Sequence, residues 1–442
     1  MPQTIETLTD RVADVGAMVD EVLATVATVR GPDLEADPRV RTDDRLRELL
    51  TGLERVRNAA EATAAQVMVA IAEEADRLDA AEYAATGLPS RSHGEFVPDE
   101  IGVLLACTKA AAGRRYGLAL RVERYPQVLR AWSSGCIDER KVQTICDEIA
   151  VLDDQDVTAD ADAFAIHELT ERLEVDGVDH ARNHTWTQTR EWMRRRVLAA
   201  VPEIAELRRC RAERERMVQV TPADDGMSHL WAVLPSVPAR EFEQALTAAA
   251  QALGSDDPRT MDQRRADLML DWLLGPDHAP VVHLHLVGGE AAVDAPPTTA
   301  WLPGVGQLTW AQTSELVLSA RTVVTPAAAD GACEPGYRPS APLERAVRTR
   351  DVTCRFPGCR RNAIGTGTGT DVDHTVPWPA GITAADNLAV LCRRHHRLKH
   401  SPGWQVVLHA NGSMTWTGPS GRTFTTHPWD LRDRPPTPVP RE

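Results

Sequence analysis

Four residues near the C-terminal end have the types and the spacing of a closed zinc site. Cys354 and Cys359 enclose a Pro-Gly turn, and Cys392 and His395 lie three residues apart at the expected start of a helix. Residues three apart on a helix face the same side. Four thiolate and imidazole ligands complete a tetrahedral shell with no open position, which is typical of a structural zinc site. We therefore expect Zn²⁺ to contribute to the folding of this segment.

A second group, interleaved with the first, has the residue types of an open catalytic site. His374 is the candidate general base, because a neutral imidazole can take a proton from water at physiological pH. Asp373 and His396 are the candidate ligands of a catalytic Mg²⁺ or Mn²⁺. Asn387 either orients the base through a backbone bond or binds the metal. Adjacent side chains of a strand face opposite sides, so a bulge or turn would be needed to bring Asp373 and His374 together.

The distribution of charge favours a nucleic-acid partner for this segment alone. The whole chain has a formal net charge of −15, but residues 345–400 hold ten basic residues against four acids. That segment is therefore +6 and the remainder is −21. Attraction of phosphates depends on the field within about 10 Å. We expect DNA phosphates to be contacted by the basic residues of the last helix, which are Arg393, Arg394, Arg397 and Lys399.

Residues 345–405 resemble an HNH endonuclease domain of the zinc-bound subclass, which has the ββα-metal fold. The resemblance rests on CRFPGC, DVDH, the central Asn387 and NLAVLCRRHHRLKH. It implies that His374 activates water and that Asp373 and His396 bind a divalent cation. The GTGTGT loop at 365–370 and the extra imidazole of His400 depart from the family pattern. The wider layout resembles actinobacterial HNH proteins with an upstream domain of unknown function, to which RRADLMLDWLLG (264–275) is also similar.

The elements that must position these residues follow from the hydrophobic periodicity of the chain. Short alternating runs predict a hairpin of strands at 217–221 and 228–234 and a further strand at 281–287. Apolar spacing of three and four predicts helices at 4–29, 43–83, 97–123, 125–134, 138–153, 160–175, 178–216, 237–252 and 259–274. Asp138 is a predicted helix cap, and Trp378 and Trp404 are expected to fill the core of the small C-terminal module.

We therefore predict a mainly α N-terminal domain with a small α+β part, followed by a small zinc-bound ββα-metal domain. The expected limits are 1–324 for the helical domain, 325–341 for a linker, 342–428 for the nuclease module with a C-terminal hairpin, and 429–442 for a disordered Pro-rich tail. We find no apolar run of about 18 residues, so no membrane span is expected. The early acids of the N-terminus argue against a secretory signal, and we expect a cytoplasmic protein.

Other motifs in the chain have ordinary explanations that we prefer. His180 and His184 have zinc-like spacing on a helix, but we prefer a solvated helix face as their explanation. His283 and His285 share one face of a strand, which favours a half-buried sheet edge. The basic run 194–216 is interrupted by acids, so a solvated helix is preferred over a DNA contact.

The leading function is a metal-dependent DNA endonuclease. The alternative is a zinc-stabilised DNA-binding module without catalysis, which would need the Cys and His zinc ligands but not Asp373, His374 or His396. A third class is an interaction protein in which the acidic helical domain binds a protein partner.

Overall fold

The chain forms two compact units, Met1–Arg209 and Cys210–Glu442. The boundary between them therefore falls earlier in the chain than the linker expected at 325–341. The structure is a computed structural model, and it describes residues 5–29, 38–87, 93–153, 163–223, 226–275, 283–285, 299–302, 306–309, 311–312, 314–315, 322–324, 333–364 and 369–428. The predicted tail at 429–442, residues 325–332 of the expected linker and residues 365–368 of the GTGTGT loop lie outside the described residues.

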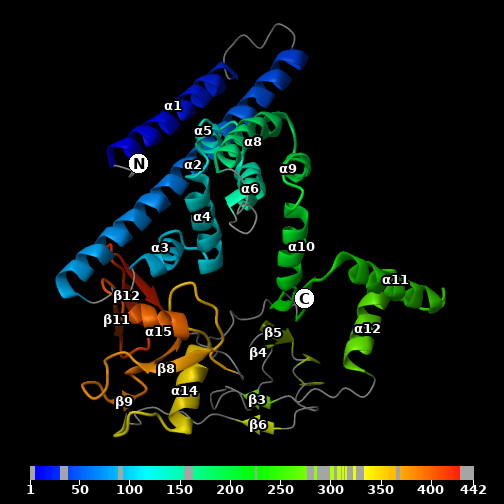
Figure 1. Cartoon of the computed structure of the whole chain (residues 1–442). Helices are drawn as coiled ribbons and strands as arrows, with labels where there is room; N and C mark the ends of the chain where they lie inside the picture. The colour runs from blue at the N-terminus through cyan, green and yellow to red at the C-terminus, as the bar shows by residue number, and fades with distance from the viewer. Residues whose placement is uncertain are drawn as a thin grey trace. The chain divides into compact units, whose positions relative to one another are not determined.

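The first unit is helical throughout its described part (Figure 1). Its two longest helices, α1 (Ile5–Val29) and α2 (Pro38–Thr86), pack against each other. The remaining helices are α3 (Val97–Leu104), α4 (Lys109–Val122), α5 (Pro126–Ser133), α6 (Glu139–Ile149), α8 (Ala163–Asn183), α9 (Trp186–Ala200) and α10 (Ile204–Arg214), with short 3₁₀ turns η2 (His93–Phe96) and η3 (Ala150–Asp153). The boundary between the two units falls within α10. None of the described helices has the length and apolar character needed to cross a bilayer.

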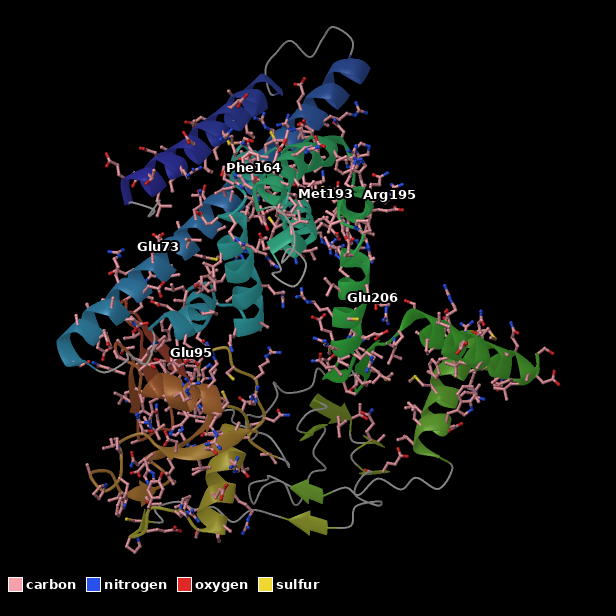
Figure 2. The ribbon with its side chains drawn as sticks, viewed as in Figure 1. Glu73, Glu95, Phe164, Met193, Arg195 and Glu206 are labelled. Carbon is pink, nitrogen blue, oxygen red and sulfur yellow. The ribbon has the colours of Figure 1, made fainter. Side chains whose placement is uncertain are left out.

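One hydrophobic core joins the helices of this unit. Met193 of α9, labelled in Figure 2, is fully buried in it. A Cβ added to Gly177 of α8 would lie 2.8 Å from the Met193 sulfur, so the glycine permits the close approach of α8 and α9. Asp138 accepts a hydrogen bond from the backbone N–H of Lys141, which confirms the predicted cap of α6.

Two predicted helices are each interrupted in the structure. The range 97–123 is divided at residues 105–108, where Ala106 has φ of 50° and Thr108 caps the start of α4. The range 178–216 belongs to three helices, because Thr185 and Gln188 form a capping box that starts α9 and Pro202 lies just after α9 ends. Both predictions of continuous helix were wrong at these points. Apolar periodicity continued across each break and concealed it.

The second unit begins with small elements. Strands β1 (Met217–Pro222) and β2 (Ser228–Val233) pair antiparallel and confirm the predicted hairpin. Helices α11 (Ser236–Ala252) and α12 (Met261–Leu274) follow and pack on each other, with Phe242 and Trp272 in an edge contact. Strands β3 (His283–His285) and β6 (Thr322–Val324) pair parallel, whereas β4 (Thr299–Leu302) and β5 (Gly306–Thr309) pair antiparallel. The side chains of His283 and His285 lie outside the described detail.

The last part of this unit contains a strand pair followed by a short helix. Strands β8 (Thr370–His374) and β10 (Leu388–Cys392) pair antiparallel, and α15 (Arg393–Lys399) follows β10 directly. Helix α14 (Ala341–Asp351) packs on both strands. Strand β7 (Cys333–Glu334), within the range expected to be linker, pairs with β9 (Thr383–Ala384). Regular structure that packs with the predicted nuclease module therefore extends back at least to Cys333.

A three-stranded antiparallel sheet, rather than the predicted hairpin, ends the described chain. It consists of β11 (Gln405–Leu408), β12 (Met414–Thr417) and β13 (Thr423–Thr426). Trp404 is 7% exposed and packs beside the fully buried Trp416, as expected for a core residue. Trp378 is 46% exposed, so its predicted place in the core was wrong. It lies instead beside Tyr337, in an edge contact at the surface.

A buried ionic network connects these elements. The Asp351 carboxylate, at the end of α14, accepts hydrogen bonds from Arg350, from Arg355 and from the backbone N–H of Val390. Arg355 is 3% exposed and also donates to the carbonyl oxygens of Gly412 and Thr426. Each buried charge is therefore paired and hydrogen-bonded, as burial requires. The network ties α14, β10 and the terminal sheet to the cysteine turn.

Candidate metal centres

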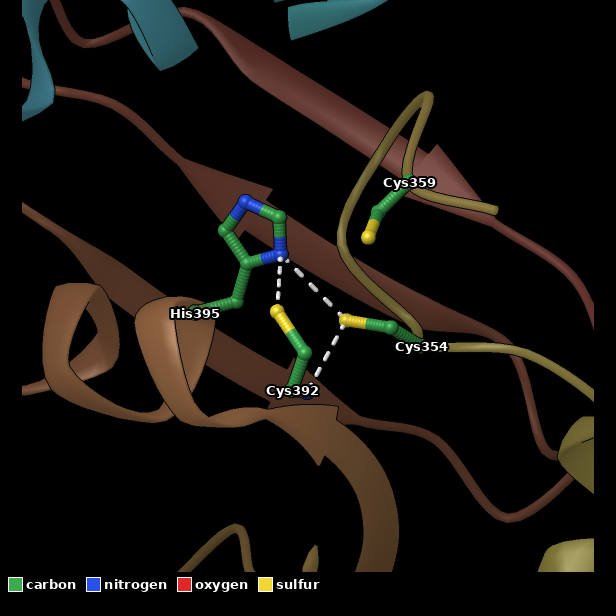
Figure 3. Close-up of side chains that lie close together, drawn as sticks. All are labelled: Cys354, Cys359, Cys392 and His395. Carbon is green, nitrogen blue, oxygen red and sulfur yellow. Dashed lines mark hydrogen bonds between the residues drawn. The ribbon is translucent and has the colours of Figure 1, made fainter. Parts of the chain in front are cut away.

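The predicted zinc residues meet in one place. One ligand atom from each of Cys354, Cys359, Cys392 and His395 lies within 4.8 Å of the others. The His395 Nδ1 lies 3.3 Å from the Cys354 sulfur and 3.2 Å from the Cys392 sulfur (Figure 3). Zinc bonds of about 2.3 Å to sulfur and about 2.0 Å to nitrogen, at tetrahedral angles, place these atoms about 3.5 Å apart. The group therefore has the chemistry and nearly the spacing of a Cys₃His site.

Local structure explains how the four ligands converge. The turn from Cys354 to Cys359 closes through a hydrogen bond from the Cys359 N–H to the Phe356 carbonyl, and Gly358 adopts φ of 73°, which favours glycine. Cys392 ends β10, and one helical turn later His395 is 2% exposed. The ring of Phe356 stacks on His395 at 4.0 Å between centroids, which fixes the imidazole plane.

The surroundings shift the pKa values of two of the thiols in opposite directions. Burial, first, and the neighbouring thiols raise the pKa of Cys354 well above its usual value. Hydrogen bonds from Cys354 and Cys359 lower the pKa of Cys392. Several thiolates this close together repel one another, and a divalent cation would hold them together.

A second group of possible ligands lies on the other side of α15. Atoms of Asp373, His396 and His400 fall within 4.8 Å of one another. The His396 Nε2 is 3.2 Å from a carboxylate oxygen of Asp373, the separation expected for neighbouring ligands of one cation with bonds of about 2.1 Å. His395 and His396 face different groups, as the helical rotation between adjacent residues predicts. The third imidazole, His400, is exposed.

His374 is not part of this group of three. β8 and β10 pair without a bulge, with Asp373 opposite Ala389 and His374 opposite Leu388. Asp373 and His374 therefore point to opposite faces of β8. The His374 ring is 5% exposed, its Nε2 lies 2.8 Å from the Thr383 hydroxyl, and Tyr337 stacks on it at 5.3 Å between centroids.

The pKa values of His374 and His396 shift in opposite directions. Burial lowers the pKa of His374, so its ring is neutral at pH 7. Burial alone would raise the pKa of Asp373, but hydrogen bonds from His396 and Lys399 outweigh it and lower the pKa. The same hydrogen bond to Asp373 raises the pKa of His396. Asp373 is therefore held as a carboxylate.

Asn387 has a structural position. Its amide oxygen accepts from the N–H of Val376 at 2.8 Å, and its amide nitrogen donates to the carbonyls of Val376 and Ile382. A Cβ on Gly381 would lie 2.2 Å from the Val376 carbonyl oxygen, so the loop folds tightly around this amide. Of the two predicted roles for Asn387, the geometry agrees with orientation of the loop after His374 rather than metal binding.

The predicted phosphate contacts divide into two kinds. Arg393 and Arg397 are exposed on α15, and Arg394 is partly buried. The Lys399 side chain is only 5% exposed, forms an ion pair with Asp373 and donates to the His374 carbonyl oxygen at 2.6 Å. It is therefore not the exposed contact expected from the sequence. No pattern in the sequence indicated the Lys399–Asp373 pair, because the two residues lie in different elements.

The remaining candidates do not assemble a metal group within the described residues. His180 and His184 stack on each other at 3.9 Å between centroids, and the His184 Nδ1 lies 2.8 Å from the His180 carbonyl oxygen. In the basic run 194–216, Arg208 forms an ion pair with Glu148 at 2.6 Å, and Arg196 lies over the Trp192 ring. The Arg208 and Glu148 side chains are only 18% and 11% exposed, so the run is not solvated along its whole length, and a DNA contact by it stays a prediction.

Comparison with known proteins identifies the family of the larger part of the chain. Residues 54–351 match the family described as Domain of unknown function (DUF222), and the chain belongs to that family. This confirms the resemblance noted for residues 264–275. The match ends at Asp351, so both ligand groups lie beyond it.

Relatives occur in Mycobacterium tuberculosis. The chain is 30% identical over 378 residues to the uncharacterized protein Rv3776, a match that covers 74% of this chain and 70% of that protein. It is 33% identical over 264 residues to the uncharacterized protein Rv2100, where the match covers 46% of this chain and 47% of the relative. The chain thus spans about half the length of this second relative. No solved structure matches.

Proposed function

We propose that this chain is a metal-dependent endonuclease that hydrolyses DNA phosphodiester bonds, with the described residues from Cys333 to Pro428 as its catalytic part. The observation that carries the proposal is the presence of two different ligand groups around one short helix. A closed Cys₃His group is buried on one side of α15, and an open carboxylate-imidazole group lies on the other. The first suits a structural Zn²⁺, and the second suits a catalytic cation with positions left for water and substrate.

The tautomer of His374 supports its role as the general base. The Thr383 hydroxyl donates its single hydrogen to the Gly336 carbonyl at 2.6 Å. The hydroxyl can therefore only accept from His374, so the ring proton resides on Nε2 and Nδ1 carries the free lone pair. A neutral imidazole with a free lone pair can take the proton of an attacking water.

The cation group and this base lie on opposite faces of β8 at its last two residues, so the proposal requires a scissile phosphate that reaches both. Asp373 and His396 are the residues that would hold the divalent cation, which would supply charge stabilisation at the scissile phosphate. Arg393 and Arg397, exposed on α15, would attract the phosphates on either side. Asn387 fixes the loop that follows His374 and so limits the positions open to that residue.

One observation favours a second candidate, a zinc-stabilised DNA-binding module without catalysis. The ammonium of Lys399 already neutralises the Asp373 carboxylate from within the protein. If no cation binds beside this ion pair, the Asp373, His396 and His400 group would be only a polar cluster, and only the Cys₃His group would bind metal. The two candidates differ in whether a cation at Asp373 ever produces cleavage.

Cleavage of supercoiled plasmid by the full chain separates these candidates. We expect nicking in Mg²⁺ or Mn²⁺ that EDTA stops and that His374→Ala removes. The protein must first be shown to contain one equivalent of zinc, so that misfolding does not mimic inactivity. Zinc-loaded protein that binds duplex DNA but leaves it intact with both cations would support the non-catalytic module.

A further inference from the structure

Lys399 places a fixed positive charge inside the open ligand group. Its side chain is 5% exposed, compared with 33% for His396 and 14% for Asp373. Its ammonium contacts one carboxylate oxygen of Asp373, whereas His396 contacts the other. It also donates to the His374 carbonyl oxygen at 2.6 Å, which holds it in place. Lys399 and a cation beside His396 can thus share the same carboxylate.

This arrangement sets the charge of the site. Asp373 is the carboxylate of the group, and Lys399 cancels it, while the imidazoles of His396 and His400 carry no charge when they are free to bind metal. Protein sites that bind hard divalent cations unaided gather several oxygen ligands, carboxylates prominent among them. A buried ammonium next to a divalent cation repels it with little screening from salt.

We propose that Lys399 weakens cation binding to the protein alone, so that the divalent cation binds firmly only together with a DNA phosphate. The phosphate would supply the negative charge that Lys399 cancels. The inference rests on the proposed function for its cation and its substrate. Binding of the cation would therefore depend on DNA. Because such coupling is reciprocal, the bound cation would increase the affinity for DNA by the same factor.

Binding of Mn²⁺, followed by the electron paramagnetic resonance signal of the free ion, tests this without any cleavage. Lys399→Gln keeps hydrogen-bond donors but removes the charge, and we expect it to bind Mn²⁺ about tenfold or more tightly than wild type without DNA. Lys399→Arg retains the charge and should behave as wild type. Arg345→Gln removes one positive charge from the exposed face of α14 and serves as the matched control.

A duplex with non-cleavable phosphorothioate linkages provides the second measurement. It should tighten Mn²⁺ binding to wild type by about tenfold or more, and to Lys399→Gln by much less. Equal or weaker Mn²⁺ binding by Lys399→Gln with its zinc retained would overturn the proposal. If Lys399→Gln loses its zinc, the measurement on the wild-type protein decides by itself. Mn²⁺ binding to wild type that the duplex does not change would also overturn the proposal. Coupling without cleavage would leave this inference standing and refute only the nuclease.

Discussion

The contact between His374 and Thr383 determines which nitrogen of the proposed base can accept a proton. Thr383 is fully buried and its hydroxyl bridges the His374 ring and the Gly336 carbonyl. Partners of this kind fix the tautomer and the orientation of a catalytic imidazole. Thr383 lies nine residues after the base, on β9, and nothing in its own sequence context indicates this role.

Thr383→Val tests this bridge. Valine has nearly the same shape but cannot accept the Nε2–H, so we expect nicking to fall about 10- to 100-fold. Zinc content should not change, because the Cys₃His group lies elsewhere. Thr383→Ser keeps the hydroxyl and should retain most of the activity. Wild-type nicking rates in the valine variant would show that Thr383 does not orient the base.

Single residues were predictable from the sequence where their partners are close in the chain or share a ligand type. Cys354, Cys359, Cys392 and His395 were recognised as one set, and the structure places them together. Asp373 and His396 also meet as predicted. The burial of Lys399 was missed, because its position depends on how α15 packs against β8. Tertiary packing decides such contacts, and spacing along the chain does not reveal them.

At the scale of elements, the Asp351 network joins the parts that carry the ligands. Its carboxylate holds Arg350, Arg355 and the backbone of β10, and Arg355 reaches the terminal sheet. The side chains of Asp351 and Arg355 are 0% and 2% exposed. Removing one partner of such a pair leaves a buried charge without compensation.

Asp351→Asn should therefore destabilise the part of the chain from Cys333 to Pro428 by about 3 kcal/mol. Asparagine keeps the size of the side chain but removes the charge that balances two arginines. Denaturant unfolding followed by tryptophan fluorescence measures the change, since Trp416 is buried beside the network and donates to the Arg355 carbonyl. Asp386→Asn, at an exposed position, is the control. Equal stability of the two variants would contradict a structural role for the network.

The predicted elements were correct in type more often than in extent. Amphipathic periodicity placed the helices, and alternation placed the β1–β2 hairpin. No glycine or proline lies within the break at residues 105–108, so no residue type there indicates the end of a helix. The break before α9 did leave a signal, the Thr185–Gln188 capping box, within a helical pattern that continued past it. Local caps can therefore end a helix that hydrophobic spacing alone would extend.

At the scale of the molecule, the two compact units are stabilised in different ways. The first has an extended hydrophobic core built from its helices. The cluster around Leu343 and Leu388 in the second is small, and the Cys₃His group lies next to it in the chain. Small modules with little apolar burial commonly depend on a metal for folding.

Removal of zinc should therefore affect one part of the chain and spare the other. We expect a strong zinc chelator to abolish one calorimetric unfolding transition and to leave the transition of the helical unit at its original temperature. Cys354→Ser should reproduce this result without the chelator, whereas Cys136→Ser, an exposed cysteine of the first unit, should not. Two unchanged transitions in metal-free protein would mean that the Cys₃His group does not stabilise the fold.

The central claim is that His374 performs the chemistry in a module that zinc holds together. The most direct test compares His374→Ala with wild type, and with His427→Ala as an exposed control, for zinc content, duplex binding and plasmid nicking in Mn²⁺. We predict that His374→Ala keeps its zinc and its DNA binding but loses nicking, while His427→Ala keeps all three. Nicking by zinc-loaded His374→Ala at the wild-type rate would contradict the proposed mechanism.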